Sequence, residues 1–123
     1  MHPAEVLNTA LALAACGDDA ALAQKMLKRY RALLPSEQAI LERAYAEQDL
    51  EMLHTRAHRL RAGSRFMGAE RMASALQRLE DVILKGAPQE VITSAWMALN
   101  QEFQALLEPP EEVLLALFAS ARQ

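Results

Sequence analysis

Apolar residues recur along the whole chain at intervals of three and four positions, with charged and polar residues between them. This spacing is typical of helices that bury one side, because residues three or four positions apart lie on the same face. Glycines, prolines and capping residues interrupt the pattern at a few points. The predicted helices span about residues 3–16, 18–48, 49–67, 69–85, 89–108 and 111–121.

Residues at the ends of these segments support the boundaries. Pro3 lies near the start of the first segment and Gly17 directly follows it, which is the usual asymmetry of a helix. Asp18 or Asp19 can cap the second helix, and Asp49 the third. Their side chains accept hydrogen bonds from the free backbone N–H groups of a first turn.

Pro35 interrupts the second segment. A proline inside a helix costs about 3 kcal/mol, because it lacks an N–H group and its ring collides with the preceding turn. We therefore expect either a kink at this point or a second helix start that is capped by Ser36.

Each segment has an apolar stripe that predicts its buried side. In the first two segments the stripes comprise Val6, Leu7, Ala10, Leu11 and Ala14, and then Leu22, Met26, Tyr30, Leu33, Ile40, Leu41 and Ala44. In the third and fifth they comprise Leu50, Leu53, Ala57, Leu60, Ser64 and Met67, and then Ile92, Trp96, Leu99, Phe103 and Leu106.

Four substantial amphipathic helices with short joins favour an all-α fold, an up-down antiparallel four-helix bundle. We expect residues 1–123 to form a single domain, with a core over about residues 5–108 and a short extra helix at the N-terminus. Residues 109–123 would be a tail or a short C-terminal helix. The composition agrees, since 24 Ala and 20 Leu outnumber the ten Val, Ile and Thr residues. Such a composition favours helices and nearly excludes an all-β fold.

The bulk properties exclude several classes of function. A net charge of −3 gives the chain no general attraction for nucleic acid. Cys16 is the single cysteine, which excludes an internal disulfide framework and a multi-cysteine zinc site, and we expect it to be a buried or half-buried small apolar residue. No apolar run approaches the roughly 20 residues that span a bilayer. We therefore expect a cytoplasmic chain without direct membrane insertion.

Residues 54–65 contain two histidines, four arginines and no acidic residue. Each helical residue lies about 100° further round the axis, which places His58 about 130° from the centre of the apolar face, toward solvent. Arg61 and Arg65 lie on the same side of the helix, and His54 and Ala62 flank His58 by one turn. An exposed imidazole can form a phosphoryl intermediate, and nearby guanidinium groups can bind the phosphoryl oxygens.

Other interpretations of this stretch are open from its chemistry alone. A basic helix face is commonly just a solvated face. His54 and His58 have the spacing of a zinc pair, although no third ligand lies nearby in the sequence and no metal is predicted. Four arginines could also contact the phosphate backbone of a nucleic acid, but four basic residues on an acidic domain are weak evidence for nucleic-acid binding.

Residues 57–69, Ala-His-Arg-Leu-Arg-Ala-Gly-Ser-Arg-Phe-Met-Gly-Ala, resemble the signature of histidine-containing phosphotransfer (HPt) domains. That signature is roughly Ala-His-x-Leu-Lys-Gly, two small residues, two variable residues, an apolar residue and Gly-Ala. The resemblance covers about residues 5–107. It implies that His58 accepts the phosphoryl group and that Arg61 stabilises it from the family's lysine position. Glu80 matches a polar Gln or Glu on the next helix.

Two residues depart from the family pattern. Ala62 replaces a glycine one turn after the histidine, and its methyl group could hinder a docking partner. Arg61 replaces lysine, which preserves the charge but changes reach and geometry.

The resemblance implies a phosphocarrier in a bacterial two-component phosphorelay, which is not a self-sufficient enzyme. Its partners would be response-regulator receiver domains and a hybrid sensor histidine kinase, contacted through Ala62, Arg65 and Glu80. His54 matches no role in the family pattern; it is either a surface polar residue or a further contact to the partner. The chain would be a cytoplasmic monomer or the cytoplasmic end of a membrane-anchored kinase. It needs no cofactor of its own, because Mg²⁺ would sit in the receiver. The alternatives are a non-phosphorylated adaptor that binds through the same face and a dimerising structural bundle.

Overall fold

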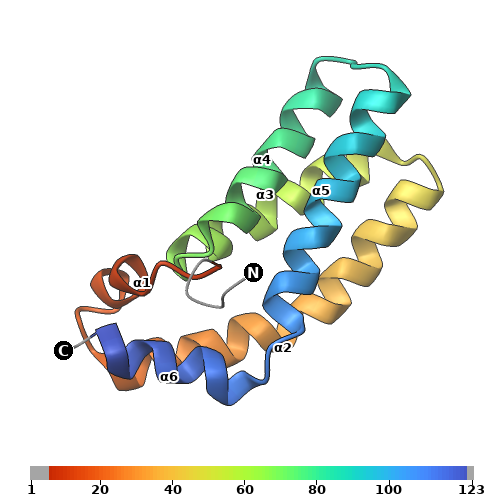
Figure 1. The fold of residues 1–123 in the computed structure, drawn as a ribbon. Coiled ribbons are helices and arrows are strands. Elements are labelled where there is room, and N and C mark those ends of the chain that lie inside the picture. Colours follow the sequence, from red (N-terminus) through yellow and green to blue (C-terminus); the bar gives the residue numbers. More distant parts are fainter. Residues whose placement is uncertain (1–5, 122–123) are drawn as a thin grey trace.

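The computed structural model describes residues 6–121, and within this range every regular element is an α-helix (Figure 1). The predicted all-helical class is therefore confirmed for this part of the chain. The helices are α1 (Thr9–Ala15), α2 (Ala20–Ala46), α3 (Leu50–Phe66), α4 (Glu70–Leu84), α5 (Gln89–Leu107) and α6 (Glu111–Ala121). None of these described helices is long and apolar enough to cross a membrane.

Two aspartates cap helices as the sequence predicts. Asp19 Oδ1 accepts a hydrogen bond from the backbone N–H of Leu22 at 3.1 Å, at the start of α2. Asp49 Oδ1 accepts one from Met52 at 3.1 Å, at the start of α3. Each cap satisfies a donor that the first turn leaves free, so both helices begin at the predicted places.

The first helix begins later than predicted. Its expected start near Pro3 lies outside the described residues. Val6 and Leu7 are described, and they precede the helix, which is capped by Asn8. The backbone N–H of Asn8 donates to the carbonyl of Gly68 at 2.7 Å. This hydrogen bond holds Asn8 against the turn between α3 and α4. The backbone around Asn8 is therefore bonded to that turn and does not form an earlier turn of α1.

The buried side of α1 also differs from the prediction. Ala10, Leu11 and Ala14 are exposed. The buried residues of the helix are Ala12 and Leu13 instead. The predicted stripe was counted from Val6 and Leu7, which are buried but precede the helix. Helical spacing counted from these two residues therefore does not give the buried side of α1.

Helix α2 continues through Pro35, so the predicted restart at Ser36 is wrong. The Ser36 hydroxyl donates to the carbonyl of Leu33 at 3.2 Å and caps no new helix. Figure 1 shows that α2 changes direction near its middle, where Pro35 lies in its sequence. This bend agrees with the predicted kink. Leu34 and Leu41 are fully buried on either side and keep both halves against the core.

The buried side of α2 is only partly as predicted. Leu22, Leu33 and Ile40 are 42%, 41% and 37% exposed, contrary to the prediction. The buried residues are Ala20, Ala23, Leu27, Tyr30, Leu34, Leu41 and Ala44. Apolar residues are adjacent in the sequence at 33–34 and 40–41, so their spacing alone does not decide which of them faces the core.

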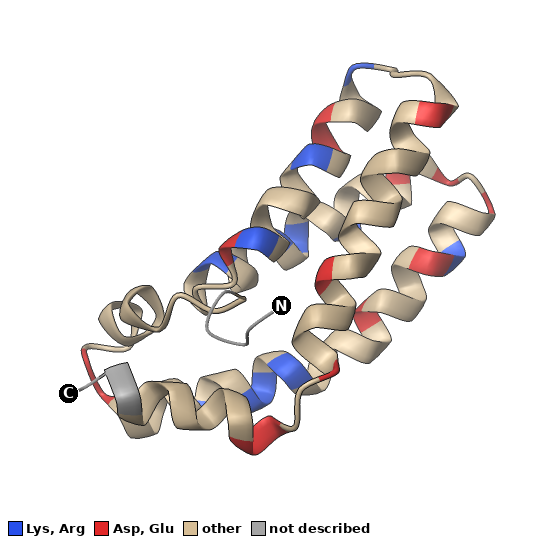
Figure 2. Ribbon diagram, in the orientation of Figure 1, with Lys and Arg blue, Asp and Glu red and all other residues tan. Residues whose placement is uncertain are grey.

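Charged residues are distributed unevenly along the helices. The first half of α2 contains four basic residues and no acidic residue, whereas its second half contains Glu37, Glu42 and Arg43 (Figure 2). Residues 52–69, which include most of α3, contain four arginines and no acidic residue. The mild negative charge of the whole chain therefore conceals basic stretches in the first half of α2 and in α3.

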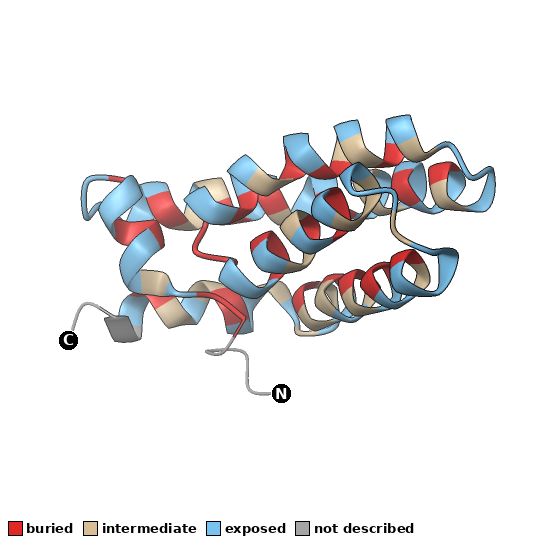
Figure 3. Cartoon of the chain, turned by 90° about the horizontal axis from the view of Figure 1, so that it is seen from above, coloured by how far each residue is buried: buried red, intermediate tan, exposed pale blue. Residues whose placement is uncertain are grey.

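Helices α2, α3, α4 and α5 enclose the main core. Helix α3 contacts α2 and α4, and α5 contacts α4 and α2, so each helix has two neighbours in this group. Buried residues lie on their inward sides (Figure 3). The stripe predicted for residues 89–108 is buried throughout, and the stripe of α3 is buried except for the half-buried Leu50.

Helices α1 and α6 pack against α2 and against each other at one end of the molecule (Figure 1). Leu114 and Phe118 of α6 are fully buried. The Arg31 guanidinium of α2 donates to the carbonyls of Leu106 at 3.1 Å and Leu107 at 2.9 Å, and also to Pro109. The connection between α5 and α6 is thereby joined to α2.

Cys16 is buried beside α1, as predicted. Its burial and, to a smaller extent, the charge of Asp19 raise the pKa of the thiol. Because the thiolate is the reactive form, this cysteine serves as a small apolar core residue.

Candidate functional site

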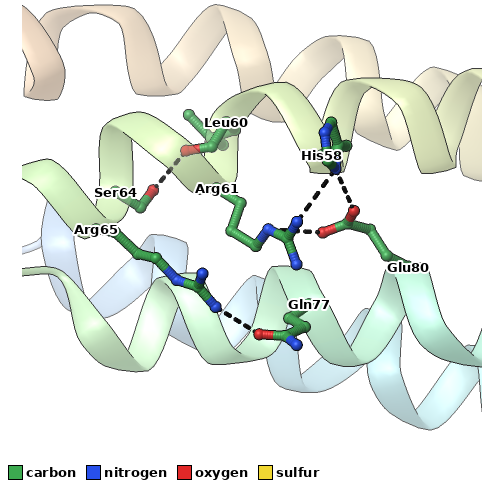
Figure 4. Close-up of polar contacts among 7 residues, drawn as sticks. All are labelled: His58, Leu60, Arg61, Ser64, Arg65, Gln77 and Glu80. Atoms are coloured by element: carbon green, nitrogen blue, oxygen red, sulfur yellow. Dashed lines mark hydrogen bonds and ion pairs between the residues drawn. The ribbon is translucent and has the colours of Figure 1, made fainter.

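His58 lies on the outward side of α3, opposite the buried Leu53, Ala57 and Leu60. Its side chain is 61% exposed, which agrees with the orientation expected from helical geometry. The ring leans toward α4, the helix that follows in the chain (Figure 4).

Glu80 of α4 holds one nitrogen of the His58 ring. Its Oε1 lies 2.8 Å from His58 Nδ1, and its side chain is only 6% exposed. A carboxylate oxygen accepts hydrogen bonds, so Nδ1 is the donor in this contact. A neutral imidazole with its proton on Nδ1 has its lone pair on Nε2. The contact therefore leaves Nε2 as the available nucleophile.

Arg61 completes a group of three with His58 and Glu80 (Figure 4). Arg61 Nε lies 3.3 Å from Glu80 Oε2, and Arg61 Nη2 lies 3.2 Å from His58 Nδ1. Arg61 Nη2 and the protonated Nδ1 are both donors, so in this tautomer Arg61 interacts chiefly with the carboxylate. A buried carboxylate needs a compensating cation. Arg61 supplies that charge and lies within one helical turn of the imidazole.

Arg65 lies two turns beyond His58 and also reaches toward α4. It donates to Oε1 of Gln77, so its guanidinium is positioned by a residue that the sequence analysis did not single out. Arg61 and Arg65 thus each bridge α3 and α4, on one side of the exposed histidine.

His54 lies one turn before His58 and is half-buried. The two rings are parallel, with centroids 6.5 Å apart and planes 4° from each other. Among the described residues, no group of three or more His, Cys, Asp or Glu side chains could hold a metal ion. Ala62, one turn after His58, is exposed.

Behind the site, Tyr30 and Ser64 join α2 to α3. The Ser64 hydroxyl donates to the carbonyl of Leu60 at 2.9 Å, so the Tyr30 hydroxyl, 2.6 Å away, donates to Ser64. Burial raises the pKa of Tyr30, which keeps this hydroxyl protonated. Ser64 within an apolar stripe was the sequence signal for a buried hydrogen bond, and its partner on α2 was not predicted.

Gly68 forms the turn between α3 and α4. Its φ is +72°, and a Cβ at this position would collide with the backbone carbonyl of Asn8. Such a conformation favours glycine. The close turn sets α4 directly beside α3, and this arrangement brings Glu80 to His58.

Comparison with known protein families identifies the class. The Hpt domain family model matches residues 25–109, which include most of α2 and all of α3, α4 and α5. The chain belongs to the Hpt domain family. Searches of curated proteins and of solved structures found no match. Hpt domains are phosphocarriers of His–Asp phosphorelays that interact with receiver domains and kinases.

Proposed function

We propose that the chain accepts a phosphoryl group on Nε2 of His58 from an aspartyl phosphate of a receiver domain, and passes it to a response-regulator aspartate. The observation that carries this proposal is the 2.8 Å contact between His58 Nδ1 and the buried Glu80 Oε1. It orients an exposed imidazole and leaves the Nε2 lone pair available.

The transfer step follows from this geometry. The Nε2 lone pair attacks phosphorus, the bond from phosphorus to the aspartate oxygen breaks, and that oxygen leaves as a carboxylate. The proton of His58 stays on Nδ1, so the phosphorylated ring carries a positive charge. Glu80 compensates this charge through a charge-assisted hydrogen bond. The reverse sequence, with a second aspartate as the attacking group, delivers the phosphoryl group onward.

The partners supply what the chain lacks in this proposal. The receiver provides the aspartate and the Mg²⁺, and a hybrid sensor histidine kinase starts the relay, so catalysis is mainly positioning. Helices α2 to α5 form the up-down antiparallel bundle that presents His58. The chain acts as a cytoplasmic monomer, and His54, Ala62 and Arg65 lie around His58 on the surface that a receiver covers.

Incubation with a phosphorylated receiver domain and Mg²⁺ tests the proposal. The phosphoryl group should appear on the chain, be labile to acid and stable to base, and be located on residue 58 by mass spectrometry. A second, unphosphorylated receiver should then remove it. A chain that binds the receiver but never gains phosphate would contradict the proposal.

That result would favour the second candidate, a non-phosphorylated adaptor that uses the same face. Ala62 is the observation that supports it, since an exposed methyl group one turn from His58 narrows the approach to the ring. An adaptor would bind its partner equally well after His58→Ala substitution, and the wild-type chain would contain no phosphohistidine.

Two substitutions of Glu80 distinguish its role in orienting the His58 ring from the effect of its negative charge. We expect Glu80→Ala to slow acceptance about tenfold, because a charge-assisted hydrogen bond of about 1.5 kcal/mol is lost. Glu80→Gln should slow it less, because the amide oxygen still accepts from Nδ1–H. Quenched time courses of labelled-phosphate transfer to each variant measure both rates. Equal rates for Glu80→Ala and the wild type would show that the contact does not orient the ring.

Substitution of Arg61 tests the cation. We expect Arg61→Ala to slow acceptance or shorten the lifetime of phosphohistidine about tenfold, because its donors no longer neutralise the phosphoryl oxygens or Glu80. Arg61→Lys should restore part of the effect, since it restores the charge without the planar fork. Label decay after removal of the donor gives the lifetime. Unchanged acceptance and decay would exclude a role for this cation.

A further inference from the structure

The first half of α2 carries a cluster of cations that the histidine site does not use. Lys25, Lys28, Arg29 and Arg31 lie close together in the sequence, and residues 20–34 contain no acidic residue (Figure 2). Three of the four, Lys25, Lys28 and Arg29, are exposed. No ion pair or hydrogen bond of these three side chains occurs among residues 6–121. Their charges are therefore not neutralised within the described part of the chain.

These three cations point away from the core. Each helical residue lies about 100° further round the axis. Lys25 accordingly lies on the side of α2 opposite the buried Leu27 and Tyr30. Lys28 and Arg29 lie on either side of Lys25. The outward side of the first half of α2 is therefore basic.

Two exposed leucines lie on the same outward side of α2. Leu22 precedes Lys25 by one turn and is 42% exposed, and Leu33 follows Arg29 by one turn and is 41% exposed. One exposed leucine is ordinary, but here two of them enclose three unpaired cations. A helix side that combines apolar and basic residues is typical of binding to an anionic membrane surface. The basic face of α2 is defined as Leu22, Lys25, Lys28, Arg29 and Leu33.

The basic face and His58 lie on different sides of the molecule. Helix α3 contacts α2 on one side and α4 on the other. The His58 ring leans toward α4 (Figure 4). A surface that covers the outward side of α2 therefore leaves the imidazole exposed.

We propose that the basic face of α2 binds the surface of an anionic lipid bilayer. The three cations lie at the lipid phosphates, and the tips of the two leucines enter the outermost part of the hydrocarbon. The chain lies on the bilayer and does not cross it. This inference is independent of the proposed function, because it uses no residue of the histidine site.

The composition of the basic face favours this occupant. Nucleic acid offers phosphates but no apolar layer for the two leucines, whereas an anionic bilayer presents phosphates directly above hydrocarbon. The net charge of the chain is −3. An anionic bilayer therefore repels the chain as a whole and attracts its basic face, which sets the orientation of the bound chain.

Sedimentation with lipid vesicles tests the charges. Vesicles of equimolar phosphatidylglycerol and phosphatidylcholine should bind the wild-type chain, and vesicles of phosphatidylcholine alone should not. Each cation strengthens binding to an anionic bilayer about fivefold, so glutamine at positions 25, 28 and 29 together should lower the partition coefficient about a hundredfold. Glutamine is a good helix former, and circular dichroism confirms the helical content. Binding by the wild type should also weaken as salt screens the charges.

The matched control replaces Arg43, Arg78 and Lys85 with glutamine. These residues are exposed and lie outside the first half of α2, so the net charge changes equally. The control should bind like the wild type, and equal loss in both triple variants would attribute binding to net charge and contradict the proposal. A wild-type chain that stays in solution with both kinds of vesicle would overturn it. Binding to polyaspartate instead of vesicles would assign the face to an acidic protein and would also overturn it.

Leu22→Gln combined with Leu33→Gln tests the apolar contact. We expect the partition coefficient to fall about tenfold at constant charge, because both leucine tips leave water in the bound state. Leu84→Gln combined with Met97→Gln is the matched control, since these residues are 77% and 60% exposed and lie on other helices. Unchanged binding by the first pair would show that charge alone acts and would overturn the insertion.

Chemical modification tests the orientation. With anionic vesicles present, acetylation of Lys25 and Lys28 by a water-soluble reagent should slow, and acetylation of Lys85 should not. Modification of His58 by diethyl pyrocarbonate should proceed at the same rate with and without vesicles. Mass spectrometry locates each modification. Protection of His58 with free reaction of Lys25 would place another face on the bilayer and overturn the proposal, and none of these results depends on phosphotransfer.

Discussion

Replacing His58 with glutamine abolishes the transfer of phosphate to the chain, and the expected loss exceeds about a hundredfold, because an amide nitrogen is no nucleophile. The glutamine amide can still contact Glu80, so the neighbouring side chains keep their partners. His58 is 61% exposed and glutamine is a good helix former, so the fold should be unaffected. Transfer of labelled phosphate from a receiver domain measures the effect, and circular dichroism confirms the helical content.

His54→Gln is the matched control, because it makes the same substitution one turn away on the same helix. The parallel stacking of the two rings makes the control stringent, since both imidazoles lie on one surface. We expect His54→Gln to be labelled at close to the wild-type rate. Equal labelling of both variants would remove His58 from the role, and labelling lost only in His54→Gln would transfer the role to His54.

Gly68→Ala is expected to lower the free energy of unfolding by about 2–4 kcal/mol, the sum of a strained left-handed residue and a lost backbone hydrogen bond. The φ of +72° is unfavourable for alanine, and its Cβ would collide with the carbonyl of Asn8. Relief of that collision requires movement of the segment whose N–H donates to the Gly68 carbonyl at 2.7 Å. Urea unfolding followed by circular dichroism measures the change.

The matched control for this prediction is Gly63→Ala, inside α3 and five residues before the turn. No atom lies within 4 Å of the added Cβ, so the substitution should raise stability by about 0.5–1 kcal/mol through helix propensity. Opposite signs for the two glycines would confirm that the turn, and not the residue type, sets the cost. A Gly68→Ala protein as stable as the wild type would show that the turn adapts freely.

The starts of α2 and α3 could be predicted because their causes are local. Asp19 and Asp49 cap helices through hydrogen bonds to residues three positions away, which a linear sequence displays directly. The buried side of α2 depends on how the helix is rotated in the assembly. Neighbouring apolar residues such as Leu33 and Leu34 satisfy the spacing equally well, and packing alone decides between them.

In the candidate site, too, the features set by a single helix could be predicted and those set by packing between helices could not. The exposure of His58 and the nearness of Arg61 follow from the geometry of one helix. Glu80 entered through the resemblance to a family, and its burial and 2.8 Å contact depend on how α4 packs against α3. The spacing placed Tyr30 on the buried side of its helix, but it gave no signal for the hydrogen bond of Tyr30 to Ser64 or for the contact of Gln77 with Arg65, because both contacts join two helices. The partner roles of His54, Ala62 and Arg65 remain predictions.

The hydrogen bond between His58 Nδ1 and Glu80 also makes the proposed reaction regioselective. Phosphohistidine exists as two isomers, which differ in the ring nitrogen that carries phosphorus. Formation of the Nδ1 isomer would require the ring to break its contact with the buried carboxylate, at a cost of about 1.5–3 kcal/mol. That cost corresponds to roughly a tenfold to hundredfold preference. One buried carboxylate beneath the ring thus selects which nitrogen of His58 is phosphorylated, although the ring itself is exposed.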